Sequence, residues 1–370
     1  MEKKQFVAEL EAGGQVDGIF LLAAAQQNQA RNGPYWRVEF RDTSGKVEGK
    51  IWSPLAQNFP DLKAGALVEV QGRVVVYRER NEIAVDAMRL LEVEERDAVN
   101  LADFVASSRH DSESMLTELE ALCRETFSHK PWIKFYRNLL RNEEIISRLR
   151  ISPAAKAMHH AYAGGLLEHT LSVCRLCLCL ADLYPQLDRQ VLLAGALCHD
   201  LGKIWELSSG LVVDYTSTGR LLGHIGIAVE KIEPLLQKSG LEPELAEHLK
   251  HLLLSHHGTR EFGSPTLPAT AEAMALHYAD NLDAKLNQVQ QALEGVPADE
   301  SGWSSYVPGL ERALFRAVAS PEAVGVRTSA RAGRMCRAGG ADGSGEAGGA
   351  GNDKTSGKAQ ETQCSLLSKA

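Results

Sequence analysis

The sequence lacks the segments that direct a chain into or across a membrane. Its first residues, 1–6, contain no apolar run of the kind that a secretory signal peptide carries. No stretch reaches the ~18–20 uninterrupted apolar residues that a membrane-spanning helix needs. We therefore expect a cytoplasmic protein that makes no contact with a membrane.

The sequence also lacks cysteines with the spacing of disulfide-bonded pairs, and it lacks a net positive charge. The seven cysteines do not have the spacing of a disulfide framework, so we interpret them as reduced intracellular thiols. Cys174, Cys177 and Cys179 resemble a zinc-binding cluster, but they lie in an apolar helical stretch and we expect them to pack in a core. The formal net charge of −8 argues against a protein that coats nucleic acid without specificity, although it leaves room for a local basic groove.

The length of 370 residues predicts more than one folding unit, because a single core usually stops growing near ~250–300 residues. Residues 16–95 alternate apolar and polar side chains and are rich in β-branched residues, which is typical of strands. About five short strands in this span fit a small closed barrel such as the OB-fold. We expect this barrel to occupy residues 1–95.

The remainder of the chain predicts helices followed by a segment without a core. We expect a helical linker over residues 96–150 and an all-α domain over residues 151–319, where apolar residues recur at helical spacing. Residues 320–370 are rich in glycine and alanine, bury too little apolar surface to fold, and are expected to be disordered. The predicted fold class is thus a multidomain chain with a β-barrel followed by a helical domain.

Adjacent imidazole and carboxylate side chains in the helical part predict a metal centre. The candidate ligands, in chain order, are His169, His199, Asp200, His224, His256, His257 and Asp280. One ion needs three or four protein ligands, so this set suits two ions ~3.5–4 Å apart with Asp200 between them. Nitrogen and oxygen ligands without thiolate suit Mn²⁺, Co²⁺, Fe²⁺, Ni²⁺ or Zn²⁺. Such ions activate water and stabilise phosphoryl oxygens, which indicates phosphoester hydrolysis.

Other polar residues near these ligands are assigned weaker roles. Lys203, one helical turn after Asp200, is expected to act with it in catalysis by binding the phosphate or protonating the leaving oxygen; the alternative is a surface salt bridge. For Glu272 and Asp283, orientation of a ligand histidine and ordinary surface exposure both stay open. The following histidines are interpreted as phosphate contacts or packing groups: His159 and His160. The following are interpreted as ordinary core or surface groups: His110, His129, His248, His251 and His277.

Aromatic and basic residues suggest contacts to a nucleic-acid strand. Barrel aromatics stack on bases in many single-strand-binding proteins, and the alternative is that they form the barrel core. The candidates are Tyr35, Trp36, Phe40 and Trp52, with Tyr77 as a further one. Arg260 begins the segment 260–265, whose glycine and proline predict a rigid loop beside the metals that contacts the substrate.

The ligand pattern resembles that of the HD superfamily of metal-dependent phosphohydrolases. Residues 159–173, 198–207, 254–265 and 272–285 are similar to the YhaM-type 3′→5′ exoribonucleases, a bacterial family that joins an OB-fold to an HD domain. This resemblance, over about residues 16–316, implies that the seven ligand positions bind two ions, with Mn²⁺ preferred. It also implies 3′→5′ hydrolysis of single-stranded RNA, with DNA as a second substrate, to nucleoside 5′-monophosphates.

Two alternatives come from other functional classes. An HD phosphohydrolase acting on a small nucleotide or a cyclic dinucleotide would not need a strand-binding barrel. A regulator that binds nucleic acid without cutting it would not need the complete ligand set. The sequence leaves open the metal, the preference between RNA and DNA, and the oligomeric state. A homo-oligomer is compatible with the sequence.

Overall fold

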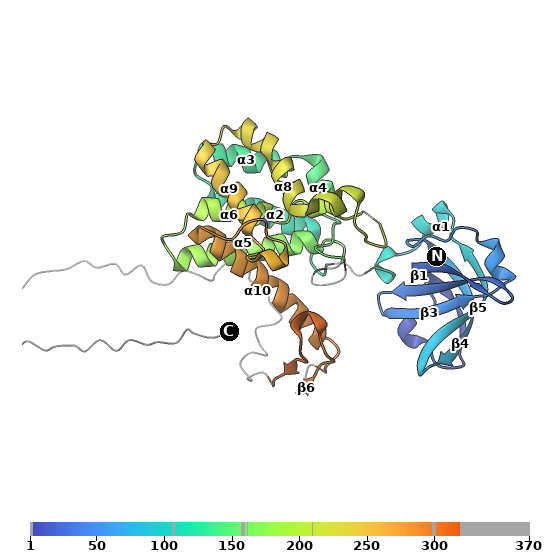
Figure 1. Cartoon of the computed structure of the whole chain (residues 1–370). Helices are drawn as coiled ribbons and strands as arrows, with labels where there is room; N and C mark the ends of the chain where they lie inside the picture. Colours follow the sequence, from blue (N-terminus) through green and yellow to red (C-terminus); the bar gives the residue numbers. More distant parts are fainter. Residues whose placement is uncertain are drawn as a thin grey trace, which may run out of the picture. The chain divides into compact units, whose positions relative to one another are not determined.

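The computed structural model describes residues 3–105, 108–156, 160, 162–208, 210–297 and 301–318. Strands in its N-terminal part close into a barrel with the order β1-β2-β3-β5-β4, in which β4 returns to pair with β1 (Figure 1). Neighbouring strands are antiparallel except for β3 and β5, which are parallel. The strands are β1 (Gln15–Ala30), β2 (Gly33–Asp42), β3 (Gly45–Ile51), β4 (Leu67–Tyr77) and β5 (Arg80–Leu90). The predicted small barrel of the OB-fold type is confirmed.

The long strand β1 explains how the barrel closes. Its first half pairs with β4 and its second half with β2, so one strand belongs to both halves of the sheet. Phe20 and Leu22 lie in the barrel core. Ile19 and Leu21 belong to a second cluster, which includes Phe104 from the segment after the barrel. The run 19–22 is therefore apolar on both faces of the strand, because each face is covered.

The short elements around the barrel and the helices complete the described chain (Figure 1). Those beside the barrel are η1 (Val7–Glu9), η2 (Leu55–Asn58), α1 (Val93–Asp97) and η3 (Leu101–Asp103). The main helices are α2 (Ser112–Thr126), α3 (Lys130–Leu140), α4 (Glu143–Leu149), α5 (Gly165–Leu183), α6 (Arg189–Cys198), α7 (Lys203–Glu206), α8 (Ser217–Ser239), α9 (Pro243–Ser255) and α10 (Ala271–Leu293). The remaining elements are η4 (Arg260–Phe262), β6 (Gly302–Trp303), η5 (Pro308–Leu310) and β7 (Phe315–Arg316). In the part of the chain that the structure describes, no helix has the length and apolar character to span a membrane.

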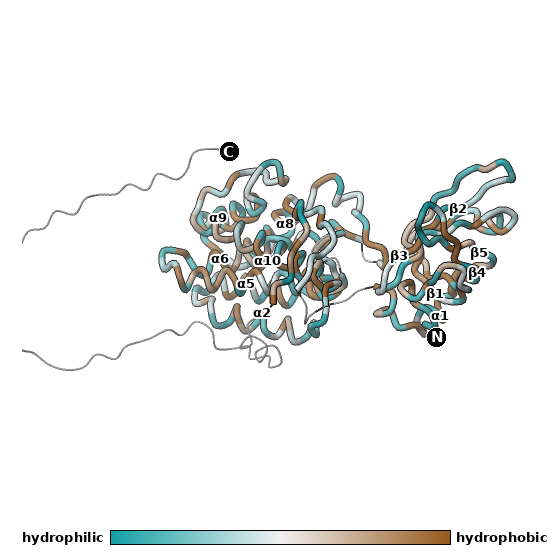
Figure 2. The backbone as a smooth tube through the Cα atoms, turned by 90° about the horizontal axis from the view of Figure 1, so that it is seen from below, coloured by the Kyte–Doolittle hydropathy of each residue, from teal (hydrophilic) through white to brown (hydrophobic). Residues whose placement is uncertain are grey.

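Helices α2 to α4 are part of the helical core, which corrects our expectation of a linker over residues 96–150. Trp132 and Phe135 of α3 are fully buried and belong to the same core cluster as the side chains of α5 and α6. Hydrophobic and hydrophilic residues both occur along the labelled helices of this part of the chain (Figure 2), as helices with one buried face require. The predicted boundary at residue 150 therefore does not separate two packing units. The predicted disordered tail, 320–370, lies outside the described residues.

Two of the three cysteines of α5 pack in the core as expected, and the third does not. Cys174 and Cys177 are buried in the core cluster, whereas Cys179 is exposed on another face of the helix. Burial in these surroundings raises the pKa of the Cys174 and Cys177 thiols above the ordinary value, so both stay protonated. A zinc cluster of these cysteines is therefore excluded by their orientation.

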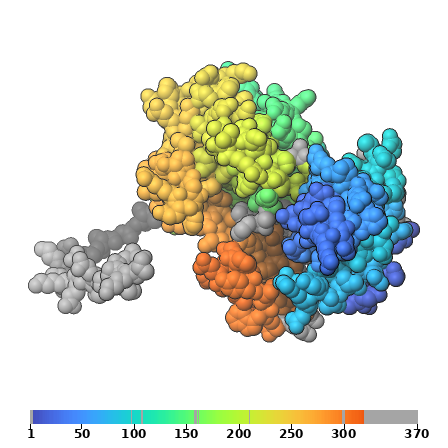
Figure 3. Space-filling model, turned by 45° about the vertical axis from the view of Figure 1, so that its right-hand side comes forward, coloured from blue at the N-terminus to red at the C-terminus, as the bar shows by residue number. Residues whose placement is uncertain are grey.

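Helices α5, α6, α8, α9 and α10 pack together in the centre of the helical part. Contacts join α5 to α6 and α10, and α9 to α6, α8 and α10. On the face shown in Figure 3 the residues of α8 and α9, in yellow-green to orange, form one continuous surface. The candidate ligands lie on the inner sides and at the ends of these helices.

Candidate metal centre

The seven candidate ligands come from different helices and meet in the helical core. His169 lies on α5, Asp280 on α10, and His224 in α8. His199 and Asp200 directly follow the last residue of α6, and His256 and His257 directly follow α9. A side chain that directly follows the last residue of a helix is positioned by that helix. Because the helix has ended there, the side chain can turn toward a neighbouring element.

Two glycines set the position of His224. Gly223 interrupts α8 with φ 67° and ψ 158°, a conformation that is essentially restricted to glycine. Gly202 lies in the turn after Asp200, where a Cβ atom would come within 1.9 Å of the carbonyl oxygen of His224. The missing side chain at residue 202 therefore lets the backbone of α8 approach Asp200, and the break at residue 223 turns His224 inward.

The first group of ligand atoms surrounds the Nε2 atom of His169. This atom lies 3.2 Å from Nε2 of His199 and 3.2 Å from Oδ1 of Asp280. Oδ2 of Asp200 lies 3.5 Å from Nε2 of both histidines. His169 and His199 are fully buried and Asp200 is 2% exposed.

The second group faces the other oxygen of Asp200. Oδ1 of Asp200 lies 3.5 Å from Nε2 of His224 and 3.7 Å from Nε2 of His256. One ligand nitrogen each from His224, His256 and His257 lies within 4.8 Å of the others. The two oxygens of Asp200 thus face two different sets of imidazoles.

Hydrogen bonds at Nδ1 orient the Nε2 atoms of these histidines toward the centre. In three of them the partner is a backbone carbonyl oxygen, which accepts the Nδ1 proton and leaves a lone pair on Nε2. These pairs are His199 with Ala196 (2.8 Å), His256 with Leu253 (2.7 Å) and His257 with Phe262 (2.7 Å). Nδ1 of His169 contacts the carboxylate of Asp283 at 2.7 Å, and Nδ1 of His224 contacts Glu206 at 3.3 Å. Metal-binding histidines are commonly oriented by such bonds at the second ring nitrogen.

The protonation states of His199, His257 and Asp200 also suit a cation. Burial lowers the pKa of His199 and of His257 to about 4 in each case, so both imidazoles are neutral near pH 7. Burial opposes the charge of Asp200, but Lys203 and the surrounding imidazoles hold the pKa of this carboxyl well below its ordinary value. Burial likewise opposes the protonation of His169, yet the nearby carboxylates raise its pKa. Neutral imidazoles and ionised carboxylates are the forms that bind metal, so His199, His257 and Asp200 are ready to bind a cation, whereas His169 has to lose a proton first.

Unpartnered buried atoms test whether an ion fits this site. Within the described residues, Oδ1 of Asp200 and Nε2 of His224 and His256 are buried without a hydrogen-bond partner. Each such atom costs ~1–3 kcal/mol when nothing compensates it. All three converge on one point between Asp200 and the second group of imidazoles. The residues present therefore fit a divalent cation.

Lys203 and Glu206 add charge at the edge of this site. Nζ of Lys203 lies 2.6 Å from Oδ2 of Asp200. Burial opposes the ammonium charge, but Asp200 outweighs it and raises the pKa of Lys203. Glu206 accepts the backbone N–H of His224 at 2.9 Å, which fixes the start of the second segment of α8. Lys203 thus lies beside Asp200, and its expected catalytic role stays a prediction.

Several residues near the site were missed or left undecided by sequence reasoning. Asp283 contacts His169, whereas Glu272 accepts the backbone N–H of Asp188 at 2.8 Å and does not contact the candidate ligands in the described part of the chain. His160 contacts Asp283 at 3.1 Å, and His159 lies outside the described residues. We expect His277 to be an ordinary core or surface group, yet it lines a pocket that also contains Asp200 and Lys203. It donates its Nδ1 proton to the carbonyl oxygen of His256. Its spacing of three residues from Asp280 was the available signal.

The barrel aromatics divide into buried and exposed sets. Phe40 is fully buried and Trp36 is 6% exposed in the barrel core, where the Trp36 indole donates to the carbonyl oxygen of Phe59. Our expectation that these two stack on bases is wrong, because their strand positions point inward. Tyr35 and Trp52 lie outside and stack on each other, with ring centroids 4.7 Å apart. They and Tyr77 remain as candidate strand contacts.

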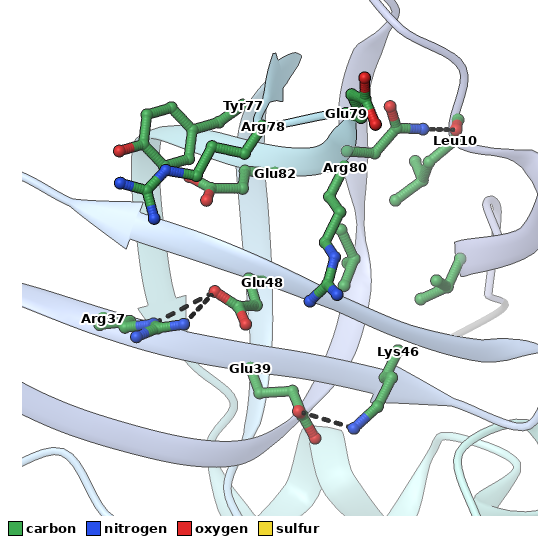
Figure 4. A pocket seen from close by; sticks show the side chains of 13 residues that line it. Leu10, Arg37, Glu39, Lys46, Glu48, Tyr77, Arg78, Glu79, Arg80 and Glu82 are labelled. Atoms are coloured by element: carbon green, nitrogen blue, oxygen red, sulfur yellow. Dashed lines mark hydrogen bonds and ion pairs between the residues drawn. The ribbon is translucent and has the colours of Figure 1, made fainter.

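Exposed side chains of β2, β3 and the β4–β5 turn line a pocket on the barrel (Figure 4). Figure 4 shows Arg37 paired with Glu48, and Lys46 paired with Glu39, across its floor. Tyr77 lies at its edge. The charges of the basic and acidic side chains cancel, so this surface has no net positive charge. It can bind a ligand through aromatic ring faces and hydrogen bonds.

Arg260 lies in η4, directly after the double histidine. Its side chain is exposed, and the neighbouring Phe262, rather than Arg260, is among the described residues that line the pocket over Asp200. The predicted loop thus lies beside the candidate ligands, since its Phe262 carbonyl holds His257.

Comparisons with known proteins match both parts of the chain. The model of the HD domain matches residues 166–285, and that of the OB-fold nucleic acid binding domain matches residues 21–91. A protein of Bacillus subtilis (strain 168) named 3′-5′ exoribonuclease YhaM is 37% identical over 308 residues, which cover 82% of this chain and 95% of that protein. A protein of the same name from Bacillus velezensis matches with the same identity and coverage.

Proposed function

The chain belongs to the family of YhaM-type 3′-5′ exoribonucleases, and we propose that it removes nucleotides from the 3′ end of single-stranded RNA by metal-dependent hydrolysis. The products are nucleoside 5′-monophosphates, and single-stranded DNA is a second substrate. The observation that carries this proposal is the convergence of unpartnered buried Asp200 Oδ1 and the Nε2 atoms of His224 and His256. A nuclease of this family needs a cation at such a point, and a scaffold that only binds RNA does not.

We assign the candidate ligands to two divalent ions, for which Mn²⁺ is the first choice. Oδ2 of Asp200 faces the first group, and Oδ1 faces the second. The first group comprises His169, His199 and Asp280, and the second comprises His224, His256 and His257. When bound, such ions lower the pKa of water toward ~7 and stabilise charge on phosphoryl oxygens. Asp200, which reaches both groups, is therefore the residue whose loss harms the site most.

Lys203 orients Asp200 and attracts the phosphate. Its ammonium is held charged, because Asp200 raises its pKa despite burial. An ammonium that lies 2.6 Å from Asp200 is placed to bind a phosphoryl oxygen electrostatically at the same centre. Of the two roles expected for Lys203, the proposal therefore favours phosphate binding.

The barrel holds the strand by ring stacking. Tyr35 and Trp52 present a stacked pair on the outside of β2 and β3, and Tyr77 presents a second ring under the ammonium of Lys50 at 4.4 Å. Stacking tolerates any base, because every base has a π face. We propose that these rings, with Arg260 near the metal centre, contact the RNA.

The test is a time course on a single-stranded RNA labelled at its 5′ end, beside the same RNA labelled at its 3′ end, with Mn²⁺ present. We expect a descending ladder from the first and immediate release of labelled mononucleotide from the second. The Asp200→Ala variant should lose at least ~10³-fold in cleavage rate and keep strand binding, because Asp200 reaches both ion groups.

The matched control is Asp182→Ala, which removes an exposed aspartate of α5 outside the site and should leave cleavage unchanged. Persistent cleavage by the Asp200→Ala protein would overturn the ligand assignment. Intact RNA with every metal supplied, together with turnover of a small nucleotide, would favour the smaller-substrate alternative.

A further inference from the structure

The pocket above the metal centre has two walls of different chemistry. Its volume of about 610 Å³ lies within the ~300–1,000 Å³ of pockets that enclose a small ligand, so it has room for about one nucleotide. Asp200, Lys203, His224 and His257 are among its lining residues. Two aromatic side chains, Phe262 and Tyr215, also lie in its lining, and the lining residues from α10 are mainly polar.

The α10 wall is one face of a helix. Its lining residues recur every three or four positions, which places them on one side of the helix. They are His277, Asp280, Asn281, Ala284, Lys285 and Gln288. Amide, imidazole and ammonium groups on this wall suit the sugar and phosphate of a nucleotide.

Phe262 is exposed although its loop is rigid. Its side chain is 69% exposed. Its backbone N–H donates to the carbonyl oxygen of Thr259 at 3.3 Å, and its own carbonyl oxygen accepts the Nδ1 proton of His257 at 2.7 Å. Ser264, 3% exposed, ties the end of the loop to the carbonyl oxygen of Leu254 at 3.1 Å. A large exposed ring carried on a hydrogen-bonded loop in the lining of a pocket is suited to a ligand that covers it.

Tyr215 is held in the same way on the strand-like segment before α8. It forms an antiparallel bridge with Leu207, and its N–H donates to the side chain of Asp214 at 2.7 Å. Asp214 in turn pairs with Lys156 at 2.8 Å. Tyr215 is 43% exposed, and the ammonium of Lys156 lies 6.0 Å from the centroid of its ring. The exposed part of the ring is available to a ligand.

We propose that Phe262 and Tyr215 form a stacking subsite for the 3′-terminal base of the RNA, while the scissile phosphate lies over the metal centre. This inference rests on the proposed function and adds to it the residues that bind the terminal nucleotide. Stacking reads no base identity, so the subsite explains how the pocket accepts each new terminal nucleotide as the strand shortens.

The experiment measures whether the side chain of Phe262 contributes to binding of the terminal base. Two RNA oligonucleotides are compared in Mn²⁺, each with a phosphorothioate at the terminal linkage: one ends in adenosine, and the other ends in an abasic ribose. Fluorescence anisotropy gives the affinity of the full chain for each. We expect the wild type to prefer the adenosine-ended strand by about ten-fold, which is the scale of one stacked base. Phe262→Ala should lose most of this preference and keep the affinity for the abasic strand.

Matched variants separate stacking from folding. Tyr278→Ala removes an aromatic ring of α10 that is 61% exposed and lies outside the described lining of the pocket, and should keep the full preference. Phe262→Trp, which retains a ring, should also keep it. Tyr215→Ala should reduce the preference as Phe262→Ala does.

Each remaining outcome decides against one idea. A wild type without preference, or a Phe262→Ala protein weakened equally for both strands, would overturn the subsite while RNA cleavage by the wild type would still support the nuclease. A wild type that prefers the terminal base but cleaves no RNA would overturn the nuclease and leave the subsite standing.

Discussion

Single buried charges act differently in the two parts of the chain. In the helical part, Asp200 keeps one oxygen without a partner among the described residues, and this oxygen faces imidazole nitrogens. In the barrel, Lys3 and Asp42 form a closed pair at 3.0 Å, with side chains 1% and 0% exposed. The first arrangement leaves room for a ligand, whereas the second is complete and therefore structural.

The closed pair predicts a stability effect at the residue scale. Lys3→Met leaves the carboxylate of Asp42 buried without its cation, and should lower the free energy of unfolding by ~3–5 kcal/mol. Urea denaturation measures this change. Lys4→Met, at an exposed neighbouring position, should change it by less than ~0.5 kcal/mol.

The same pair predicts a response to acid. Burial opposes the charge of Asp42, but bonds from Ser44, Val7 and Lys3 outweigh it and hold the folded-state pKa below the ordinary value. A depressed carboxyl pKa contributes stability above the unfolded pKa of ~3.9, and this contribution is lost as pH falls through the folded value. The Lys3→Met protein should therefore show a smaller loss of stability than the wild type as the pH falls below about 4. An identical acid profile would contradict this account.

At the scale of elements, the site depends on where helices end or break. His199 follows α6, His256 follows α9, and His224 follows the break at Gly223. A continuous α8 would carry His224 in a different direction. These three ligands are thus positioned by the ends or the break of a helix. The apolar faces of the helices pack together and hold these ends in place.

The break in α8 predicts opposite effects for two alanine substitutions in one helix. Gly223→Ala should destabilise the chain by ~1–3 kcal/mol and weaken Mn²⁺ binding, because φ 67° with ψ 158° strains any residue with a Cβ although the space is open. Gly226→Ala, at an exposed helical position three residues later, should stabilise it by up to ~1 kcal/mol. Thermal unfolding and isothermal titration with Mn²⁺ measure both. Equal effects at the two positions would show that the break has no special role.

At the scale of the whole molecule, a bound ion would join ligands from helices that span the helical part. α5, α6, α8, α9 and α10 each provide or precede at least one candidate ligand. Because the native state alone presents this arrangement, a ligand that binds it raises the free energy of unfolding by about 2.7 kcal/mol at a concentration 100 times its Kd.

Metal linkage is therefore measurable without catalysis. Adding Mn²⁺ should raise the Tm of the helical part in scanning calorimetry, and chelation with EDTA should reverse the shift. Asp200→Ala should abolish it, while Asp182→Ala should keep it. A shift that survives in the Asp200→Ala protein would mean that the ion binds elsewhere.

The sequence by itself determined the classes of residue and their order. Ligand side chains at His169, His199 and Asp200 identify the HD pattern because metal chemistry restricts which residues can occupy those positions. Alternating strands predict the barrel, because the period of two is a local property of the backbone.

Tertiary structure decided which face each side chain takes and which neighbours it meets. Trp36 and Phe40 alternate with Tyr35 as any strand would, but only barrel closure determines that the first two point inward. The contact of Asp283 with His169 and the pocket position of His277 depend on how α10 packs on α5 and α9. Such contacts join residues that are far apart in the chain, so they cannot be predicted from the local sequence. They are determined by how the helices pack.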